Sequence, residues 1–162
     1  MDTETSQKLE EELWKALKSD RTVMLGINGE DDGHSRPMTA VVEGESGPIG
    51  FFTAKSNGAG ARLDTTRRAI AALTAKGHDL FASIHGSVSV HHGRAVIDRL
   101  WDALIAAWYE GKDDPKLVLP RFDAERAEVW LNESNMLAGV KMLFDSDPKE
   151  DYKNNVGEVD LR

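Results

Sequence analysis

The sequence predicts a mainly β fold of the α+β class, built on an antiparallel sheet. Three β-branched and apolar runs, at 21–28, 34–43 and 49–53, are separated by short turns rich in glycine and acidic residues, which is typical of a strand meander. Two other segments, 6–18 and 95–109, repeat apolar residues every three to four positions and are expected to be amphipathic helices. The 162 residues, 40% of them hydrophobic, suit a single domain with one core.

The rest of the chain continues this β-rich pattern. Polar and apolar residues alternate over 80–91, which predicts a long strand. The stretch 60–74 is ambiguous, because its alanine-rich part, 69–73, is compatible with either a helix or a buried strand. The remaining expected elements are a hairpin of strands 117–122 and 127–131 turning at 123–126, a helix over 133–144, and an acidic, loosely ordered tail over 145–162.

Composition excludes several classes of protein. The chain has no cysteine, so disulfides, cysteine-ligated metals and thiol nucleophiles are excluded, and a cytoplasmic location is expected. The acidic residues 1–5 are followed by no apolar stretch, so we expect no secretory signal, and no run approaches the ~20 apolar residues of a membrane-spanning helix. A formal net charge of −8 disfavours nucleic acid and anionic membranes as partners and favours a small molecule or a protein.

Several short motifs resemble one family when they are taken in order along the chain. They are Ser35-Arg36-Pro37-Met38, Gly50-Phe51-Phe52-Thr53, Gly86 in the long strand, Leu100-Trp101 with Trp108-Tyr109, Asp113-Asp114-Pro115, and Ala127-Glu128-Val129-Trp130. Their order and spacing over about residues 8–131 are similar to those of pyridoxamine-phosphate-oxidase-like proteins, in particular the bacterial general stress proteins of that class. The resemblance implies a six-stranded antiparallel split β-barrel of the FMN-binding type, with flanking helices.

The resemblance also implies a site for flavin mononucleotide (FMN) at the interface of a homodimer. Arg36 is expected to bind the phosphate, because a guanidinium offers two parallel hydrogen bonds to a dianion, while Pro37 and Met38 contact the ring system. Trp108 is expected to form a wall of this site near the dimer contact. The other expected cofactor-binding residues are Phe52, Thr53, Lys55, Ser56 and Asn57. A surface position for Arg36, and a purely turn-closing role for the polar residues after Phe52, stay open as alternatives.

Two positions depart from the family pattern. Where the family carries a serine and, two residues later, a lysine for the flavin phosphate, this chain has Asn57 and Ala59. The missing lysine removes a positive charge, so FMN affinity falls unless Lys55, Arg62 or the backbone amides of 58–60 replace it. FAD, or no flavin at all, therefore remains an alternative to FMN.

The function implied by the resemblance is that of a flavin-dependent oxidoreductase with a stress-related role, in which the cofactor supplies the electron transfer. The alternative is a stress-response module that binds flavin without turnover, or binds none. True pyridoxamine-phosphate oxidation is disfavoured, because residues 127–132 lack the arginine and histidine that would hold the substrate phosphate. No residue is assigned a catalytic role.

Three other groups of residues have plainer interpretations. Asp113 and Asp114 precede a proline and predict a turn rather than an acid/base pair. His85 and His91 are expected ~20 Å apart on one strand, too far to bind one ion, so no metal site is expected. Trp101 and Trp108 lie on one helical stripe, and at least one of them is expected in the core.

Overall fold

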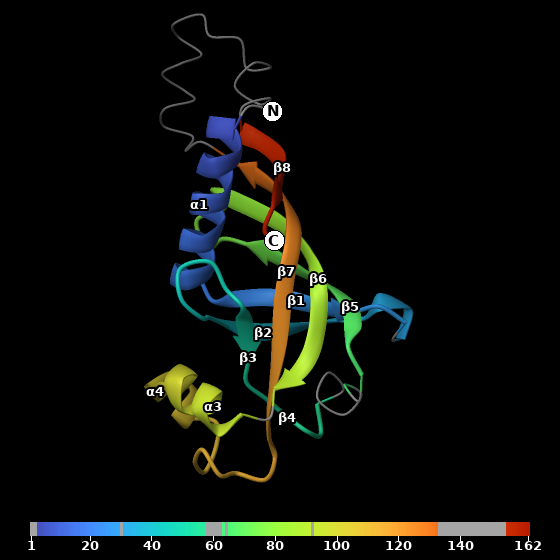
Figure 1. Cartoon of the computed structure of the whole chain (residues 1–162), viewed down its shortest axis with the longest axis vertical. Helices are drawn as coiled ribbons and strands as arrows, with labels where there is room; N and C mark the ends of the chain where they lie inside the picture. The colour runs from blue at the N-terminus through green and yellow to red at the C-terminus, as the bar shows by residue number, and fades with distance from the viewer. Residues whose placement is uncertain (1–2, 30, 58–62, 64, 92, 133–154) are drawn as a thin grey trace, which may run out of the picture.

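The computed structural model describes residues 3–29, 31–57, 63, 65–91, 93–132 and 155–162 (Figure 1). Its elements, in chain order, are α1 (Thr3–Ser19), β1 (Thr22–Ile27), a 3₁₀ turn (Asp31–Gly33), β2 (Ser35–Val42), β3 (Ile49–Phe51), β4 (Thr53–Ala54), β5 (Arg67–Thr74), β6 (Leu80–His91), α3 (Arg94–Leu100), α4 (Ala103–Ala106), β7 (Leu117–Leu131) and β8 (Val156–Asp160). The helix predicted over 133–144, and Ala59 and Arg62 of the expected phosphate loop, lie outside the described residues.

Six of the strands close into an antiparallel barrel. Neighbouring strands follow the order β3, β2, β1, β5, β6, β7, and β7 returns to β3 through the pairs Ile49↔Phe122 and Gly50↔Arg121. The short strand β4 and the C-terminal strand β8 also pair with β7, at different points along its length. The predicted six-stranded antiparallel split barrel is therefore confirmed. The open question about residues 69–73 is settled in favour of a strand, since they belong to β5.

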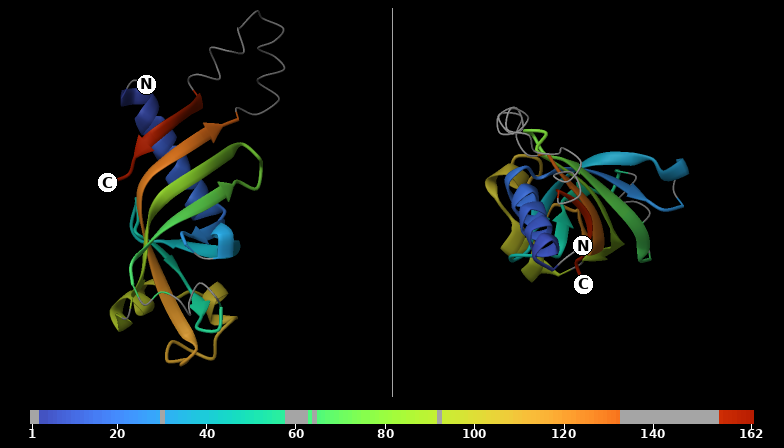
Figure 2. Two further views of the ribbon diagram at one scale, coloured as in Figure 1. Left: turned by 90° about the vertical axis from the view of Figure 1, so that its right-hand side faces the viewer. Right: turned by 90° about the horizontal axis from the view of Figure 1, so that it is seen from above.

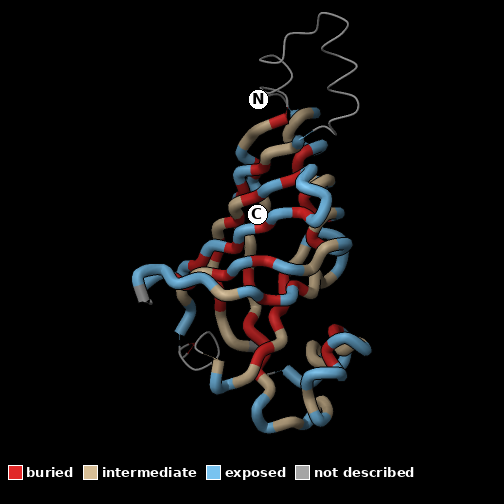
Figure 3. The backbone as a smooth tube through the Cα atoms, turned by 180° about the vertical axis from the view of Figure 1, so that it is seen from behind, coloured by how far each residue is buried: buried red, intermediate tan, exposed pale blue. Residues whose placement is uncertain are grey.

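The core fills the barrel and continues under α1. Buried and exposed positions alternate along the barrel strands, as the tube in Figure 3 shows, because successive side chains of a strand point to opposite faces. Phe51 and Phe122 are both fully buried, with ring centroids 6.4 Å apart. Helix α1 adds the apolar face expected of it, made of Leu9, Leu13, Trp14 and Leu17. None of the described helices has the length and apolar character needed to cross a membrane.

The hairpin predicted within residues 117–131 is wrong. These residues form one strand, β7, which pairs with β6 along almost its whole length. The register shifts from His85↔Arg126 to Gly86↔Ala124, so Glu125 is an extra residue accommodated by a β-bulge. The charged residues that suggested a turn lie on the outer side of this strand, where Glu125 forms an ion pair with Arg68.

The single helix predicted over 95–109 is also wrong, because the chain breaks at Trp101. This residue has extended backbone angles (φ −69°, ψ 126°) and separates α3 from the short α4. Its ring packs edge-on against Phe52, with centroids 5.9 Å apart. Neither tryptophan of this region is in the core, since Trp101 is half-buried and the side chain of Trp108 is 79% exposed.

The C-terminal segment is more ordered than the sequence suggested. Residues 156–160 form β8, which pairs with the 126–130 part of β7, and Val159 is buried. Figure 2 shows β8 alongside β7 with α1 next to it, and α1 and β8 are in contact. The expected loose tail is therefore wrong for these residues, because their alternating pattern supplies one more strand to the free edge of β7.

Candidate functional site

A pocket of about 390 Å³ opens between β2, β4 and the segment that carries α4. Figure 1 shows α4 and β4 together at the lower end of the molecule. The lining residues are Pro37, Met38, Thr39, Phe52, Thr53, Ala54, Asn57, Leu104, Ile105, Trp108 and Tyr109. A volume of this size, lined mainly by apolar and aromatic residue types with a few polar ones, is typical of a site for a small organic ligand.

The pocket gathers most of the residues that the sequence singled out. Those that line it are Pro37, Met38, Phe52, Thr53, Asn57 and Trp108, which come from three separate stretches of the chain. Arg36, Lys55 and Ser56 do not line it. Thr39, Ala54, Leu104, Ile105 and Tyr109 line it without having been predicted.

The three absent residues have local explanations. Arg36 shares a face of β2 with Met38, which lines the pocket, but it lies two residues nearer the beginning of the strand, just outside the lining. Lys55 and Ser56 are exposed corner residues of a tight turn, which is closed by a 2.9 Å hydrogen bond from the Asn57 amide to the Ala54 carbonyl. The sequence located the right loop, but the turn directs only its end toward the pocket.

Aromatic rings form one wall of the pocket. Strand β3 ends at Phe51 and pairing resumes at Thr53, so Phe52 occupies the break between β3 and β4. Behind Phe52 lies Trp101, which in turn contacts Tyr109 at a centroid distance of 6.5 Å. Tyr109 lines the pocket because the helix ends at Ala106. The sequence predicted one continuous helix through residue 109, and so it did not place Tyr109 in the site.

The polar groups of the pocket are few and uncharged. Thr53 is only 4% exposed, Asn57 is half-buried, and Tyr109 contributes a phenol. Burial, together with the Asp114 carboxylate, raises the pKa of Tyr109, so its hydroxyl stays protonated at neutral pH. No carboxylate, ammonium or guanidinium stands among the described lining residues. The pocket is therefore suited to a small uncharged group that accepts or donates a few hydrogen bonds.

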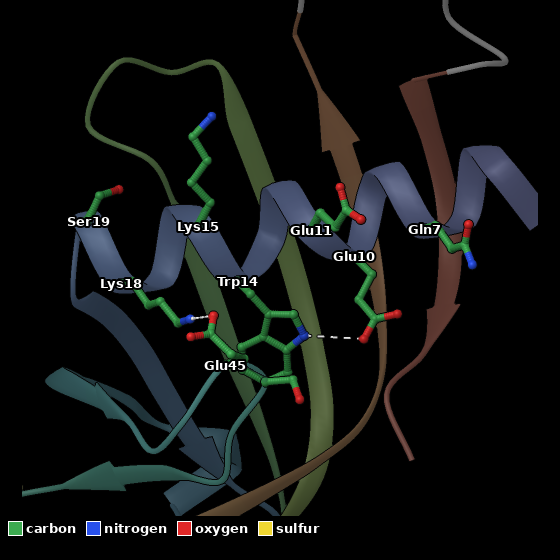
Figure 4. Close-up of a pocket in the computed structure, with 9 residues that line it drawn as sticks. Gln7, Glu10, Glu11, Trp14, Lys15, Lys18, Ser19 and Glu45 are labelled. Carbon is green, nitrogen blue, oxygen red and sulfur yellow. Dashed lines mark hydrogen bonds and ion pairs between the residues drawn. The ribbon is translucent and has the colours of Figure 1, made fainter.

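A second and larger hollow, of about 780 Å³, lies beside α1 (Figure 4). Two pairs of its lining residues interact: Lys18 Nζ is 2.7 Å from Glu45 Oε2, and Trp14 Nε1 donates to Glu10 Oε1 at 3.4 Å. None of the residues predicted to bind a cofactor lines this hollow. We therefore take the smaller pocket as the candidate site, since size alone does not indicate a ligand.

The other titratable residues singled out by the sequence lie away from this pocket. Burial, and then the charges of Arg126 and Arg68, hold the pKa of His85 below its usual value. Asp114 accepts hydrogen bonds from the backbone amides of Glu110 and Lys116, which confirms its role in a turn. Across the part of the chain that the structure describes, no group of three or more histidine, aspartate or glutamate side chains is arranged to hold a metal ion.

The structure is a closed split barrel with an aromatic-lined pocket between β2, β4 and α4, and a pocket of this kind suits a small organic ligand. The family model described as pyridoxamine 5'-phosphate oxidase like matches residues 8–151, and the chain belongs to this family.

The comparisons with individual proteins indicate the general stress branch of this family. A solved structure from Xanthomonas campestris pv. campestris, assigned to the general stress family, is 60% identical, with a TM-score of 0.75 and coverage of 80% of this chain and 90% of that one. A general stress FMN/FAD binding protein from Xanthomonas citri is 59% identical, with a TM-score of 0.75 and coverage of 80% and 92%. General stress protein 26 of Bacillus subtilis (strain 168) is 28% identical over 47 residues, which span 29% of this chain and 34% of that relative.

Proposed function

We propose that the pocket between β2, β4 and α4 binds a flavin, with FMN as the cofactor. The observation that carries this proposal is the convergence of Pro37, Phe52, Thr53 and Trp108 on one pocket of about 390 Å³. Its apolar walls and uncharged hydrogen-bonding groups match the chemistry of an isoalloxazine ring. The Xanthomonas citri relative, described as an FMN/FAD binding protein, supports the same assignment.

Each side of the pocket would contribute differently to flavin binding. Phe52 and Trp108 would contact the faces or edges of the ring, where aromatic contacts are favourable. Thr53, Asn57 and the protonated hydroxyl of Tyr109 would supply hydrogen bonds to the polar edge of the ring. The flavin itself would carry the electron transfer, and the chain would bind it, orient it and exclude water.

The phosphate of FMN needs a positive charge that the described lining of the pocket does not provide. We infer that Arg36 fills this need, because it adjoins Pro37 and is half-buried on the first part of β2. The alternative cation for the phosphate is Lys55, which lies at the exposed corner of the turn after β4.

A homodimer with the pocket at its interface is part of the same proposal. Large apolar side chains are exposed on and near the pocket side of the barrel: Met24 at 40%, Ile70 at 37%, Leu104 at 49% and Trp108 at 79%. Met24 pairs with Pro37 and with Ala72, and so connects the pocket strand to β5. Exposed apolar surface of this kind favours contact with another protein surface. Sedimentation velocity at micromolar concentration tests the proposal, and a monomer would contradict it.

We further propose that the protein is a flavin-dependent oxidoreductase that acts in the cytoplasm in a stress-related role. The second candidate is a flavin-binding module without turnover. It is favoured by one observation: the only titratable side chain on the described lining is Tyr109, whose raised pKa makes it a poor acid or base at neutral pH. Because a flavin can exchange electrons without protein acid/base groups, both candidates share the same binding site.

A single sequence of measurements separates these possibilities. The purified protein is first examined for flavin absorbance in the visible spectrum, then stripped and titrated with FMN, FAD and riboflavin. Saturable FMN binding supports the site, whereas a colourless protein that binds none of the three overturns it. Anaerobic reduction of the bound flavin by NADH or NADPH then supports the oxidoreductase, and a bound flavin that neither donor reduces favours the module.

A further inference from the structure

The wall of the pocket formed by α4 needs anchoring from outside the helix. Helix α4 has four residues, Ala103–Ala106, and helices this short are unstable on their own. It nevertheless carries Leu104 and Ile105 into the pocket, and it positions Trp108 and Tyr109 immediately after it. The burial of Ile105 provides one anchor. A second anchor is an ion pair at the beginning of the helix.

Asp102 uses its two carboxylate oxygens for two different partners. Oδ1 accepts a hydrogen bond from the backbone amide of Ile105 at 3.0 Å, which caps α4. Oδ2 lies 2.9 Å from Nη1 of Arg21, at the end of the loop that precedes β1. The carboxylate therefore joins the helix to the barrel.

Arg21 continues this connection to the opposite wall of the pocket. Its Nε donates to the carbonyl of Ala40 on β2 at 3.1 Å, and Ala40 directly follows Thr39, which lines the pocket. Backbone and side-chain contacts thus run from β2 through Arg21 and Asp102 to Ile105. We call this set the Arg21–Asp102 bridge. It connects two walls of one pocket whose residues lie far apart in sequence.

Burial and charge make this bridge different from the surface ion pairs of the molecule. The side chains of Arg21 and Asp102 are 27% and 40% exposed. Burial acts to raise the pKa of Asp102, but the Ile105 amide and the Arg21 guanidinium outweigh it, and the pKa is below its ordinary value. Nη2 of Arg21 is buried and makes no hydrogen bond within the described part of the chain. The other two nitrogens of the guanidinium bind Asp102 and the Ala40 carbonyl, so one side chain joins both walls of the pocket.

We propose that Arg21 and Asp102 are positioning residues that fix the α4 wall against β2 and thereby set the affinity of the pocket for its planar ligand. This inference rests on the proposed flavin site. Neither residue lines the pocket, so both act through α4 and β2 rather than by contact with the ligand.

The test compares R21M, which removes the bridge but keeps the Asp102 cap, with R21K, which keeps a cation near Asp102. D102N is the second variant, because asparagine still caps the helix but carries no charge for Arg21. The matched control is R99M, which removes an ion pair of 2.5 Å between α3 and Glu43 that has no contact with the pocket. Urea unfolding of each variant verifies that the comparison is made between folded proteins.

Two readouts are measured, one without flavin and one with it. In the flavin-free protein, hydrogen exchange at the Ile105 amide should become about tenfold faster in R21M than in R99M, corresponding to about 1.4 kcal/mol. The dissociation constant for FMN should rise by a similar factor, R21K should recover part of the loss, and the residual fluorescence of the bound flavin should increase as Trp108 and Tyr109 move away from it.

Each result has a defined meaning. If R21M and D102N match R99M in both exchange and FMN affinity, the inference is overturned. If exchange accelerates but FMN affinity and flavin fluorescence do not change, the bridge is only structural, and the positioning role is rejected. If the wild-type protein binds no flavin, the proposed function fails by itself, while faster exchange in R21M would still support the part of the inference that concerns the α4 wall.

Discussion

Gly86 on β6 lies directly against the backbone of Asp123 on β7, and a Cβ atom at Gly86 would be 2.1 Å from the Asp123 carbonyl oxygen. This contact is at the bulge where Glu125 leaves the register between the two strands. The obstacle is backbone rather than a movable side chain, so the strands must separate if residue 86 acquires a side chain. Glycine at this position thus permits the bulge that lets β7 run as one strand.

Replacing Gly86 with alanine should destabilise the barrel by at least roughly 2 kcal/mol, because overpacking a close backbone contact forces the strands apart. Urea unfolding followed by circular dichroism measures the change. Gly93→Ala is the matched control, because a Cβ there would meet only Val96 at an ordinary 3.5 Å and the backbone angle is negative. Equal stabilities of the two variants would contradict this interpretation of the bulge.

Replacing Arg36 with methionine should weaken FMN binding by ~1.5–3 kcal/mol, the range for a hydrogen bond to a charged group. Riboflavin, which has no phosphate, should bind the variant and the wild type equally. Isothermal titration of both ligands gives the two affinities. Lys55→Met serves as the comparison, and a loss of FMN affinity in that variant alone would assign the phosphate to the turn after β4.

Replacing Trp108 with alanine should weaken the binding of FMN and riboflavin alike, by roughly twofold to tenfold, because an aromatic contact contributes roughly 0.5–1.5 kcal/mol beyond its buried area. Since Trp108 is largely exposed, the free energy of unfolding should hardly change. Phe81→Ala is the control, as it removes another exposed aromatic ring that does not line the pocket. Unchanged affinity for both flavins would remove Trp108 from the site.

His85 should titrate below its ordinary pKa of 6.5, because it is partly desolvated and lies near Arg126 and Arg68. A lowered pKa means that the unfolded chain binds the proton more readily. The neutral form therefore stabilises the fold fully above pH 6.5, and this contribution is lost as the pH falls toward the pKa of the folded state. Nuclear magnetic resonance of the ring protons measures the titration, and Arg126→Gln should raise the value. A wild-type pKa at or above 6.5 would contradict the expected environment.

The architecture was predictable where one period dominated the sequence. Alternation along 80–91 and the apolar face of residues 6–18 depend on local geometry, and both elements formed as expected. Residues 69–73 were ambiguous, because alanine favours helices in isolation while its small side chain also fits a barrel interior. The decision came from tertiary pairing with β1 and β6, which no local pattern records.

The errors share a physical cause, which is the packing of segments distant in sequence. The charges of 123–126 suggested a turn, but Arg68 and Arg121 form ion pairs with Glu125 and Asp123 on the outside of a strand. The spacing of Trp101 suggested a continuous helix, but its ring packs against Phe52 and its backbone is extended, which ends the helix there.

The prediction of the site was incomplete for the same reason. Motifs located the strand and the loop, whereas the absence of Arg36 from the pocket lining and the presence of Tyr109 in it depended on the three-dimensional structure.

The three-residue strand β3 has a consequence for how the protein folds. It closes the barrel against β7 through only two paired positions, between residues that are distant in the chain. Contacts of this kind form slowly, because the intervening chain must lose entropy before they are gained. The pocket begins directly after this seam, at Phe52. A ligand held there would therefore slow the opening of the barrel at the junction with the fewest paired positions, and flavin would act on the unfolding rate as well as on any chemistry.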